Sequence, residues 1–276
     1  MADVAGTAAT ATAAAPARRA PLAVRLRPML LGCAPLAVVV AAWELVYRAG
    51  IYSSVLLPAP SEVLHVFLTQ SAELLKHTEA SLARVVVGVS LSIVTAIPFG
   101  LVVGRYKLID QISDWSIQIF RSFPPISLIP LAMLFFGIGD KPAIMLIWLA
   151  SFWPLAISTI FGVKNVERTL LKVARSAHAS DGLVLRKILL PGAMPSILTG
   201  LRLAIGAGWL TVVTAEMMAV RSGLGYMIMY AQITFHPDVI FAGILIIGAI
   251  GLLFDQALRL VRKRLCRWQD GLVLDS

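Results

Sequence analysis

The sequence predicts an all-α membrane protein with about six transmembrane helices. Of its 276 residues, 58% are hydrophobic and only 14% are charged, whereas soluble domains carry about 25% charged residues. Several apolar runs reach ~20 residues with few or no charges, the length needed to cross ~30 Å of hydrocarbon. The basic residues, which give a net charge of +9, fall between these runs and not on one soluble face. This pattern excludes a soluble domain and argues against a nucleic-acid partner.

Six spans and two tails account for the chain. Residues 1–28 are rich in Ala and Thr and are expected to form a disordered cytoplasmic tail. No small-residue cleavage site follows the first apolar run, so this run is expected to stay as the first span of a membrane domain over 29–268. Residues 269–276 are expected to form a second cytoplasmic tail. The six expected spans are 29–47, 81–104, 116–138, 142–163, 196–220 and 239–261.

The distribution of Lys and Arg predicts the orientation, because cytoplasmic loops carry an excess of both. With a cytoplasmic N-terminus, and with Arg259 counted with the C-terminal segment, the inside segments hold 17 basic residues and the outside segments hold four. Both termini are therefore expected in the cytoplasm.

The outside segment 48–80 is expected to contain a surface helix. Pro58 and Pro60 hold the chain extended, and Ser61 can then cap a helix that runs through about residue 76. An apolar stripe gives this helix one face to bury. The stripe consists of Val63, Val66, Phe67 and Leu74.

Small residues recur in the fifth span at the spacing that lets two helices approach closely. They are Gly200, Ala204, Ala207 and Gly208. Packing against a second copy of the chain and packing within one subunit are both compatible with this pattern.

Residues 164–195 form the longest and most basic cytoplasmic loop, and they are not a random linker. Apolar residues recur at helical spacing, Ser180-Asp181-Gly182 interrupts that helix, and a second run from Leu183 to Leu189 leads to Pro191. This predicts a helix-turn-helix outside the bilayer. Its apolar face is open to a cytoplasmic partner or to the ends of the chain's own spans. The apolar positions of the first helix are Val166, Leu170, Val173, Ala174 and Ala177.

Three charged residues in the spans are candidates for the transport pathway. Glu216 lies in the apolar run 210–220, where a charge costs roughly 2.5–3.5 kcal/mol at mid-bilayer. It either lines a pathway or gate, or it pairs with an arginine or hydroxyl of another helix. Arg121 and Arg202 either attract an anionic substrate or reach the lipid head groups. Two ion pairs at helical spacing are also expected, Asp255 with Arg259 and Glu44 with Arg48.

The loop resembles the coupling loop of ATP-binding-cassette (ABC) importer permeases. That pattern reads Glu-Ala-Ala, a Gly four residues later, then nine residues and Ile-x-Leu-Pro. Ile188-Leu189-Leu190-Pro191 matches its end, whereas Lys172-Val173-Ala174 and His178 stand at the Glu-Ala-Ala and Gly positions. The residues assigned by this resemblance to contact with an ATPase are Lys172, Val173, Ala174, His178, Ala179, Ser180, Ile188, Leu190 and Pro191.

The resemblance covers about 30–268 and is to the nitrate/sulfonate/taurine branch of these permeases. Six stretches carry it in addition to the loop. They are 57–63, 125–139, 196–203, 215–217, 223–226 and 241–268.

This resemblance implies a MetI-like type I importer permease fold and a function. The chain is expected to form the pathway for a small anion such as nitrate, bicarbonate, cyanate, taurine or another sulfonate. Its expected partners are a second permease copy, two ATPase subunits, a substrate-binding protein and the bilayer of a bacterial inner membrane.

ATP hydrolysis is expected from the partner, because the chain has no Gly-x-x-x-x-Gly-Lys-Ser/Thr motif that would hold ATP phosphates. The chain itself is expected to be no enzyme and to hold no cofactor or metal. Two alternatives remain: an ion-coupled secondary transporter with Glu216 as proton relay, and a scaffold protein without transport.

Overall fold

The computed structural model describes residues 35, 38–50 and 57–265, and the chain divides into two units, 1–51 and 52–276. In the first unit residues 38–48 are helical, and Arg48 Nε donates to Glu44 at 2.9 Å, which confirms this expected ion pair. The expected tails 1–28 and 269–276 lie outside the described residues, and so does most of 29–37 in the first span.

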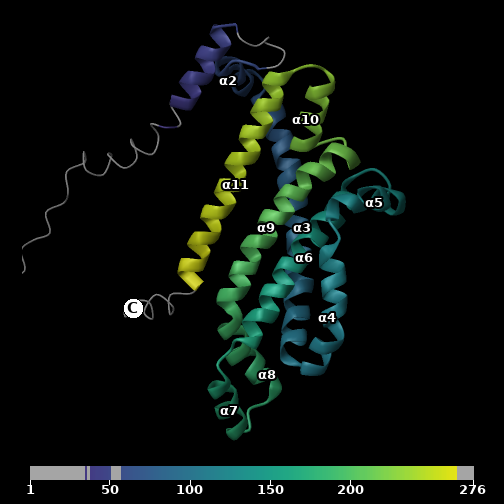
Figure 1. The fold of residues 1–276 in the computed structure, drawn as a ribbon, viewed down its shortest axis with the longest axis vertical. Coiled ribbons are helices and arrows are strands. Elements are labelled where there is room, and N and C mark those ends of the chain that lie inside the picture. Colours follow the sequence, from purple (N-terminus) through teal and green to yellow (C-terminus); the bar gives the residue numbers. More distant parts are fainter. Residues whose placement is uncertain (1–34, 36–37, 51–56, 266–276) are drawn as a thin grey trace, which may run out of the picture. The chain divides into compact units, whose positions relative to one another are not determined.

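The second unit is built from helices, among which α6 lies between α3 and α9 (Figure 1). A short 3-10 helix, η1, and a π-helical turn, η2, interrupt the series. In chain order the elements are α2 (Pro60–Thr69), α3 (Ser71–Arg105), α4 (Lys107–Ser122), η1 (Pro125–Leu128), α5 (Ile129–Phe136), α6 (Asp140–Lys164), α7 (Arg168–Ser176), α8 (Asp181–Val184), η2 (Leu185–Leu189), α9 (Leu190–Ala219), α10 (Leu224–Ile233) and α11 (Pro237–Leu265).

Four helical stretches of the described chain are long and apolar enough to cross a membrane. They are Ser71–Arg105, Asp140–Lys164, Asp181–Ala219 and Pro237–Arg264. Each contains or largely overlaps one of the expected spans 81–104, 142–163, 196–220 and 239–261. Two are longer than expected: α3 begins at Ser71, and α9 begins at Leu190 as a continuation of the loop.

The expected span 116–138 is not one straight helix. α4 and the segment Pro125–Phe136 meet at a bend of 80°. Phe123 and Pro124 each precede a proline, which disfavours the α conformation, and both are extended with ψ of 119° and 125°. If this bent pair is one crossing, the described residues contain up to five.

The surface helix α2 begins differently from the expectation. Ala59 is the N-cap, so the prediction that Ser61 caps the helix is wrong. Pro60 stands at the first helical position, which suits its fixed φ, and Glu62 Oε2 accepts a hydrogen bond from the Ala59 backbone N–H at 2.9 Å. The helix is interrupted at Gln70, so the rest of the expected surface helix belongs to α3. The apolar stripe is confirmed at Val63, Val66 and Leu74, all of which are buried.

Glycines of α3 allow its close contact with α6. A methyl group on any of three glycines of α3, spaced by about three turns and one turn, would overlap an α6 side chain, so the two backbones pack closer than larger residues allow. The Cβ-to-atom distances would be 2.6 Å from Gly88 to Ile147 Cγ2, 2.6 Å from Gly100 to Thr159 Cβ and 2.8 Å from Gly104 to Val163 Cβ.

The contact between α6 and α9 is built in the same way, with serines opposite the glycines. Gly162 of α6 faces Ser196 of α9, while Gly200 and Gly208 of α9 face Ser158 and Ser151 of α6. Ala204 lies in the same row and is fully buried, and its carbonyl accepts a hydrogen bond from Ser151 Oγ at 2.9 Å. Of the two readings of the small residues in the fifth span, Gly200, Ala204 and Gly208 therefore pack within the subunit.

Substitution by alanine at two glycines of α9 should change the stability of the protein in opposite directions. Gly200→Ala should lower stability by about 1–3 kcal/mol, because the new methyl group would overlap Ser158. Gly206 has no neighbouring atom within 4 Å of a built Cβ, so Gly206→Ala should raise stability by up to about 1 kcal/mol through helix propensity. Thermal unfolding of both variants in detergent tests this pair, and equal shifts would contradict the packing described.

Candidate functional site

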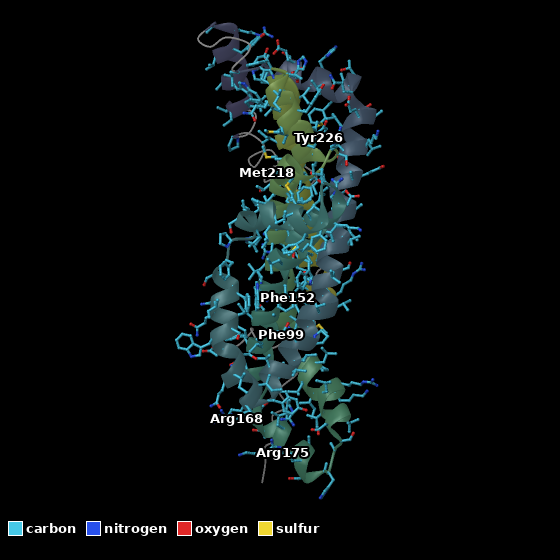
Figure 2. All side chains as sticks on the ribbon, turned by 90° about the vertical axis from the view of Figure 1, so that its right-hand side faces the viewer. Phe99, Phe152, Arg168, Arg175, Met218 and Tyr226 are labelled. Atoms are coloured by element: carbon cyan, nitrogen blue, oxygen red, sulfur yellow. The ribbon has the colours of Figure 1, made fainter. Side chains whose placement is uncertain are left out.

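Residues 164–195 form a compact cap at one end of the helices, termed here the loop end (Figure 1). α7 is followed by a turn, α8 and the π-helical turn η2, which runs directly into α9. The expected helix-turn-helix is thus present. Arg168 and Arg175 of α7 lie at this extremity in Figure 2.

One side of this cap is packed against the bundle. Val166, Ala174, Val184 and Leu189 are buried in one hydrophobic cluster together with residues of α3, α6 and α9. Arg105 Nη2 of α3 also lies 3.3 Å from Asp181 Oδ1 at the start of α8. The cap is therefore attached to the bundle by apolar packing and by one largely exposed ion pair.

The other side of the cap leaves apolar side chains in the open. Leu170 is 49% exposed, Val173 61% and Leu183 51%. The predicted apolar face of α7 is therefore only partly covered: Ala174 packs against the bundle, whereas Leu170, Val173 and Ala177 are exposed. The exposed basic residues Arg168, Lys172 and Arg175 accompany these apolar side chains on α7. We call the exposed set of Leu170, Val173, Leu183, Arg168, Lys172 and Arg175 the loop patch.

His178 ends α7 in the left-handed conformation, with φ of 54°. The Ala179 N–H donates to the Ala174 carbonyl and the His178 N–H to the Arg175 carbonyl, both at 3.0 Å. This is a Schellman ending, in which the residue after the C-cap is usually glycine. The backbone thus explains why the coupling-loop pattern has Gly where this chain has His178.

The other residues assigned to the coupling loop lie mainly inside the cap or at the starts of its helices. Ala179, Ile188 and Leu190 are partly buried against the cluster, and Ser180 is the N-cap position of α8. Pro191 directly follows η2 within the helical run 181–219, where its missing N–H leaves one helix hydrogen bond unmade. Contact of any of these residues with an ATPase stays a prediction.

At the opposite end of the bundle, Glu216 is fully buried and hydrogen-bonded from three sides. Arg84 Nη1 of α3 donates to its Oε1 at 2.6 Å. Its Oε2 accepts from Ser81 Oγ at 2.8 Å and from the Gly225 N–H at 3.0 Å. Of the two interpretations of Glu216, the geometry fits an interhelical partner of an arginine and a hydroxyl.

Two glycines make room for this carboxylate. Gly223 has φ of 105°, and a Cβ on it would overlap the Glu216 carboxylate. A Cβ on Gly225 would overlap the Val213 carbonyl. The segment that begins α10 can therefore wrap around Glu216 only with glycine at both positions; Tyr226, labelled in Figure 2, follows directly.

Arg84 extends the network to two further segments. Its Nε donates to Asp140 Oδ1 at 2.8 Å, and its remaining donors reach the carbonyl and hydroxyl of Ser222 at 2.9 and 2.5 Å. α3, α6, α9 and the 220–223 turn thus meet at one guanidinium. Sequence reasoning assigned no role to Arg84. It could have been singled out in the same way as Glu216, because it is an ionisable residue inside an apolar span.

The two candidate pathway arginines have different surroundings. Arg202 Nη2 of α9 lies 2.5 Å from Asp255 Oδ1 of α11, and Arg259 Nη2 lies 2.8 Å from Oδ2 of the same carboxylate. The expected pair of Asp255 with Arg259 is confirmed, and Arg202 joins it as a tie between α9 and α11. Arg121 near the end of α4 is exposed.

α4 is amphipathic and buries none of its residues. Leu108, Ile112, Trp115 and Ile119 form an exposed apolar stripe at helical spacing, with Leu108 and Ile112 each 69% exposed. Gln111, Asp114, Gln118 and Arg121 form a neighbouring exposed polar stripe. A polar stripe of this kind in a membrane protein normally faces water or protein, because lipid would not solvate it.

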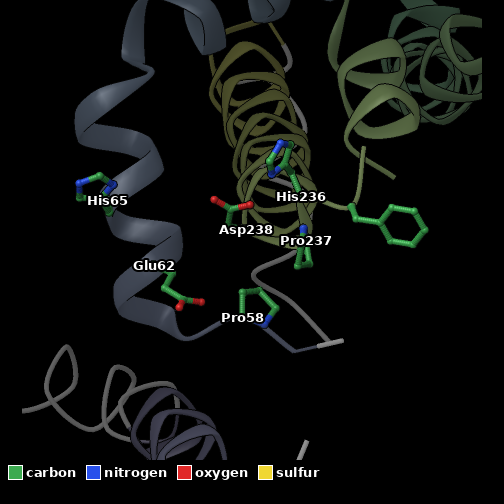
Figure 3. A pocket seen from close by; sticks show the side chains of 7 residues that line it. Pro58, Glu62, His65, His236, Pro237 and Asp238 are labelled. Atoms are coloured by element: carbon green, nitrogen blue, oxygen red, sulfur yellow. The ribbon is translucent and has the colours of Figure 1, made fainter. Parts of the chain in front are cut away.

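A cavity of about 350 Å³ opens at the end of the bundle that holds Glu216 (Figure 3). Glu62 and His65 come from α2, Pro237 and Asp238 begin α11, and His236 directly precedes it; Pro58 precedes α2. No group of three or more potential metal ligands occurs in the described part of the chain, so this cluster does not constitute a metal site.

The sequence is similar to those of a family of membrane transport proteins. Residues 96–267 match the model for the binding-protein-dependent transport system inner membrane component. The chain is 38% identical over 249 residues to the taurine transport system permease protein TauC of Escherichia coli, over 88% of this chain and 90% of TauC. It is 35% identical over 237 residues to a putative aliphatic sulfonates transport permease protein SsuC of Bacillus subtilis, covering 85% and 86%. It is 33% identical over 235 residues to the bicarbonate transport system permease protein CmpB of Synechocystis, covering 80% and 83%.

The fold has a counterpart among solved structures. A chain of the methionine ABC transporter MetNI, in an inward-facing conformation, superposes with a TM-score of 0.55 at 20% identity, over 68% of this chain and 95% of that chain. The expected MetI-like fold is confirmed by this similarity.

Removing Arg84 should destabilise the protein severely. Arg84→Gln leaves the Glu216 carboxylate buried without its counter-charge, which typically costs about 3–5 kcal/mol. The double change Arg84→Met and Glu216→Met should recover much of this loss, because no lone charge remains. Arg48→Gln, at an exposed ion pair, should cost less than about 1 kcal/mol. Thermal unfolding of the three variants in detergent is the measurement, and a double variant less stable than Arg84→Gln would disprove the pairing.

His178→Gly should stabilise the cap by about 1 kcal/mol, because glycine adopts the left-handed conformation without strain. The neighbouring Ala177 has an ordinary φ of −80°, so Ala177→Gly should bring no such gain. Hydrogen exchange of the 168–184 backbone reports on this region directly. Equal or lower protection in His178→Gly would refute the strain argument.

Proposed function

The chain belongs to the binding-protein-dependent transport system inner membrane component family, and on this premise we propose that it forms the pathway of an ATP-driven importer for a small anion. The residues 164–195 then couple it to separate ATPase subunits. A substrate-binding protein delivers the anion from outside, and both termini lie in the cytoplasm of a bacterium, as the excess of Lys and Arg in the inside segments indicates.

The loop patch is the observation that carries the coupling role. Leu170, Val173 and Leu183 stay exposed although Ala174, Val184 and Leu189 are buried against the bundle, and α7 also carries the exposed basic residues Arg168, Lys172 and Arg175. An apolar centre with a charged rim is the usual composition of a docking surface. An ATPase with an apolar groove and acidic rim fits it, and movement of that groove would reach α9 through α8 and η2.

The amphipathic α4 supports a pathway between two copies of the chain. Its apolar stripe offers a surface for a second copy, and its adjacent polar stripe, which includes Arg121, would line water between them. An exposed arginine on such a stripe attracts anions. Arg202 is a weaker candidate because Asp255 already neutralises it.

The substrate class rests on the relatives and on this charge pattern. The relatives are named for taurine, aliphatic sulfonates and bicarbonate, which are small and carry an anionic group. Nitrate and cyanate share that chemistry. We assign the class of small anions and not one member of it.

The alternative of a secondary transporter with Glu216 as proton relay receives no support from the geometry. A relay group must exchange its proton with a pathway, whereas Glu216 is fully enclosed by Arg84, Ser81 and Gly225. Its contacts indicate a structural tie.

Replacing Leu170 and Val173 together by Asp should reduce ATP-dependent uptake by at least about tenfold, measured with whichever of taurine, bicarbonate and nitrate the wild type takes up, because a docking interface would have to bury two unpaired carboxylates. Uptake is measured in vesicles that contain the whole transporter, with membrane insertion checked separately. Thr169→Asp adds a charge to the same helix at an exposed polar position and should leave most activity.

Wild-type uptake by the double variant would exclude the loop patch as the coupling surface. Uptake that persists without ATP and stops when the proton gradient is collapsed would instead support the secondary transporter.

A further inference from the structure

A second cavity, of about 410 Å³, lies at the loop end where α6, α9 and the last turn of α11 meet. Its size is within the range of small-ligand sites. Ile157 and Phe161 of α6 and Pro195 of α9 form apolar walls. Ser158, Ser196 and Arg262 add hydrogen-bond donors from α6, α9 and α11. No acidic residue lines it in the described part of the chain.

Three donors in this cavity have no partner among the residues that the structure describes. Arg262 makes no ion pair there, in contrast to Arg202 and Arg259, which share Asp255. Ser158 and Ser196 likewise make no hydrogen bond within the described residues. Thr199 is different, because its hydroxyl donates to the Pro195 carbonyl at 3.0 Å.

The two serines are held in place by the packing between α6 and α9. Ser158 lies against Gly200, and a Cβ on Gly162 would come within 2.8 Å of the Ser196 Cβ. Their positions are therefore fixed by the closest contact of the two helices, and they need no rearrangement to bind a ligand. Sites with positions fixed in advance lose less free energy to ordering on binding.

We propose that this cavity binds an oxyanion, with the Arg262 guanidinium as the counter-charge and the Ser158 and Ser196 hydroxyls as neutral donors. A guanidinium presents a planar set of N–H groups that matches phosphate, sulfonate or carboxylate oxygens. Two sources offer this chemistry at the loop end: the phosphate of an anionic phospholipid, and a free sulfonate on its way out of the pathway. The second source depends on the proposed transport function, whereas the first does not.

The lipid source is tested with the full-length chain, purified and exchanged into mixed phosphatidylcholine and phosphatidylglycerol. Native mass spectrometry then counts the phosphatidylglycerol retained per chain. Arg262→Gln and the double change Ser158→Ala with Ser196→Ala should each retain roughly tenfold less than wild type, because each removes charge-assisted hydrogen bonds. Alanine keeps the Cβ of both serines, so the helix packing is preserved. Arg264→Gln removes an exposed charge two residues away that does not line the cavity, and it should retain as much lipid as wild type.

The free anion is tested by equilibrium binding of radiolabelled taurine to the same variants in phosphatidylcholine nanodiscs. A loss in Arg262→Gln and in the serine variant, but not in Arg264→Gln, supports the site with taurine as the source. The same pattern in lipid retention supports it with phospholipid as the source, even if the importer proposal fails. Unchanged binding in both measurements overturns the proposal, and so does an equal loss in Arg264→Gln, which would indicate a diffuse effect of charge.

Discussion

The close approach of α6 to α3 on one side and to α9 on the other is the constraint on which the rest of the structure depends. In a membrane, helices gain little from apolar burial against each other, because lipid tails are equally apolar. Association must then come from dense contact, which glycine and serine provide. Gly88, Gly100 and Gly104 supply it toward α6, and Ser151 and Ser158 supply it between α6 and α9. This three-helix core positions both the loop cap and the buried ion pair.

Each end of this core is closed by a different kind of interaction. At the loop end, apolar side chains of the cap extend the core cluster through Ala174 and Val184, which leaves one surface of the cap free. At the other end, Arg84 and Glu216 neutralise each other. Such a buried pair adds little net stability compared with apolar residues, but it strongly disfavours arrangements in which either charge is alone. α3, α6 and the segment formed by α9 and the turn after it are thereby held in one arrangement.

The features that were predictable from the sequence are those with local causes. Apolar runs revealed four of the membrane helices, and charge spacing revealed the pairs Asp255–Arg259 and Glu44–Arg48, whose partners are one helical turn apart. Arg84 and Glu216 are 132 residues apart, so only the folded arrangement joins them. The prolines Pro124 and Pro125 indicate a kink within 116–138, but the size of the bend depends on tertiary packing, because apolarity continues through both residues.

The loop was predictable in position but not in detail. Leu170 and Val173 share an apolar character with Ala174, and only tertiary packing decides which of them is covered. His178 carries only a weak signal of a left-handed conformation, because histidine is enriched there but most histidines adopt other conformations. Its role became visible through the glycine of the family pattern and the backbone hydrogen bonds together.

The unbroken run from Asp181 to Ala219 gives the molecule a mechanical property. Its 39 residues would make a rod of about 58 Å if fully α-helical, with the cap at one end and Glu216 near the other. A tilt of this rod at α8 would therefore also move its far end. The close contacts of Gly200 with Ser158 and of Gly208 with Ser151 lie between the two ends of this rod and would act as its pivot. With that pivot, about 35 Å of the rod lies on the cap side and about 23 Å on the Glu216 side, so a push at the cap would reach the far end reversed and reduced.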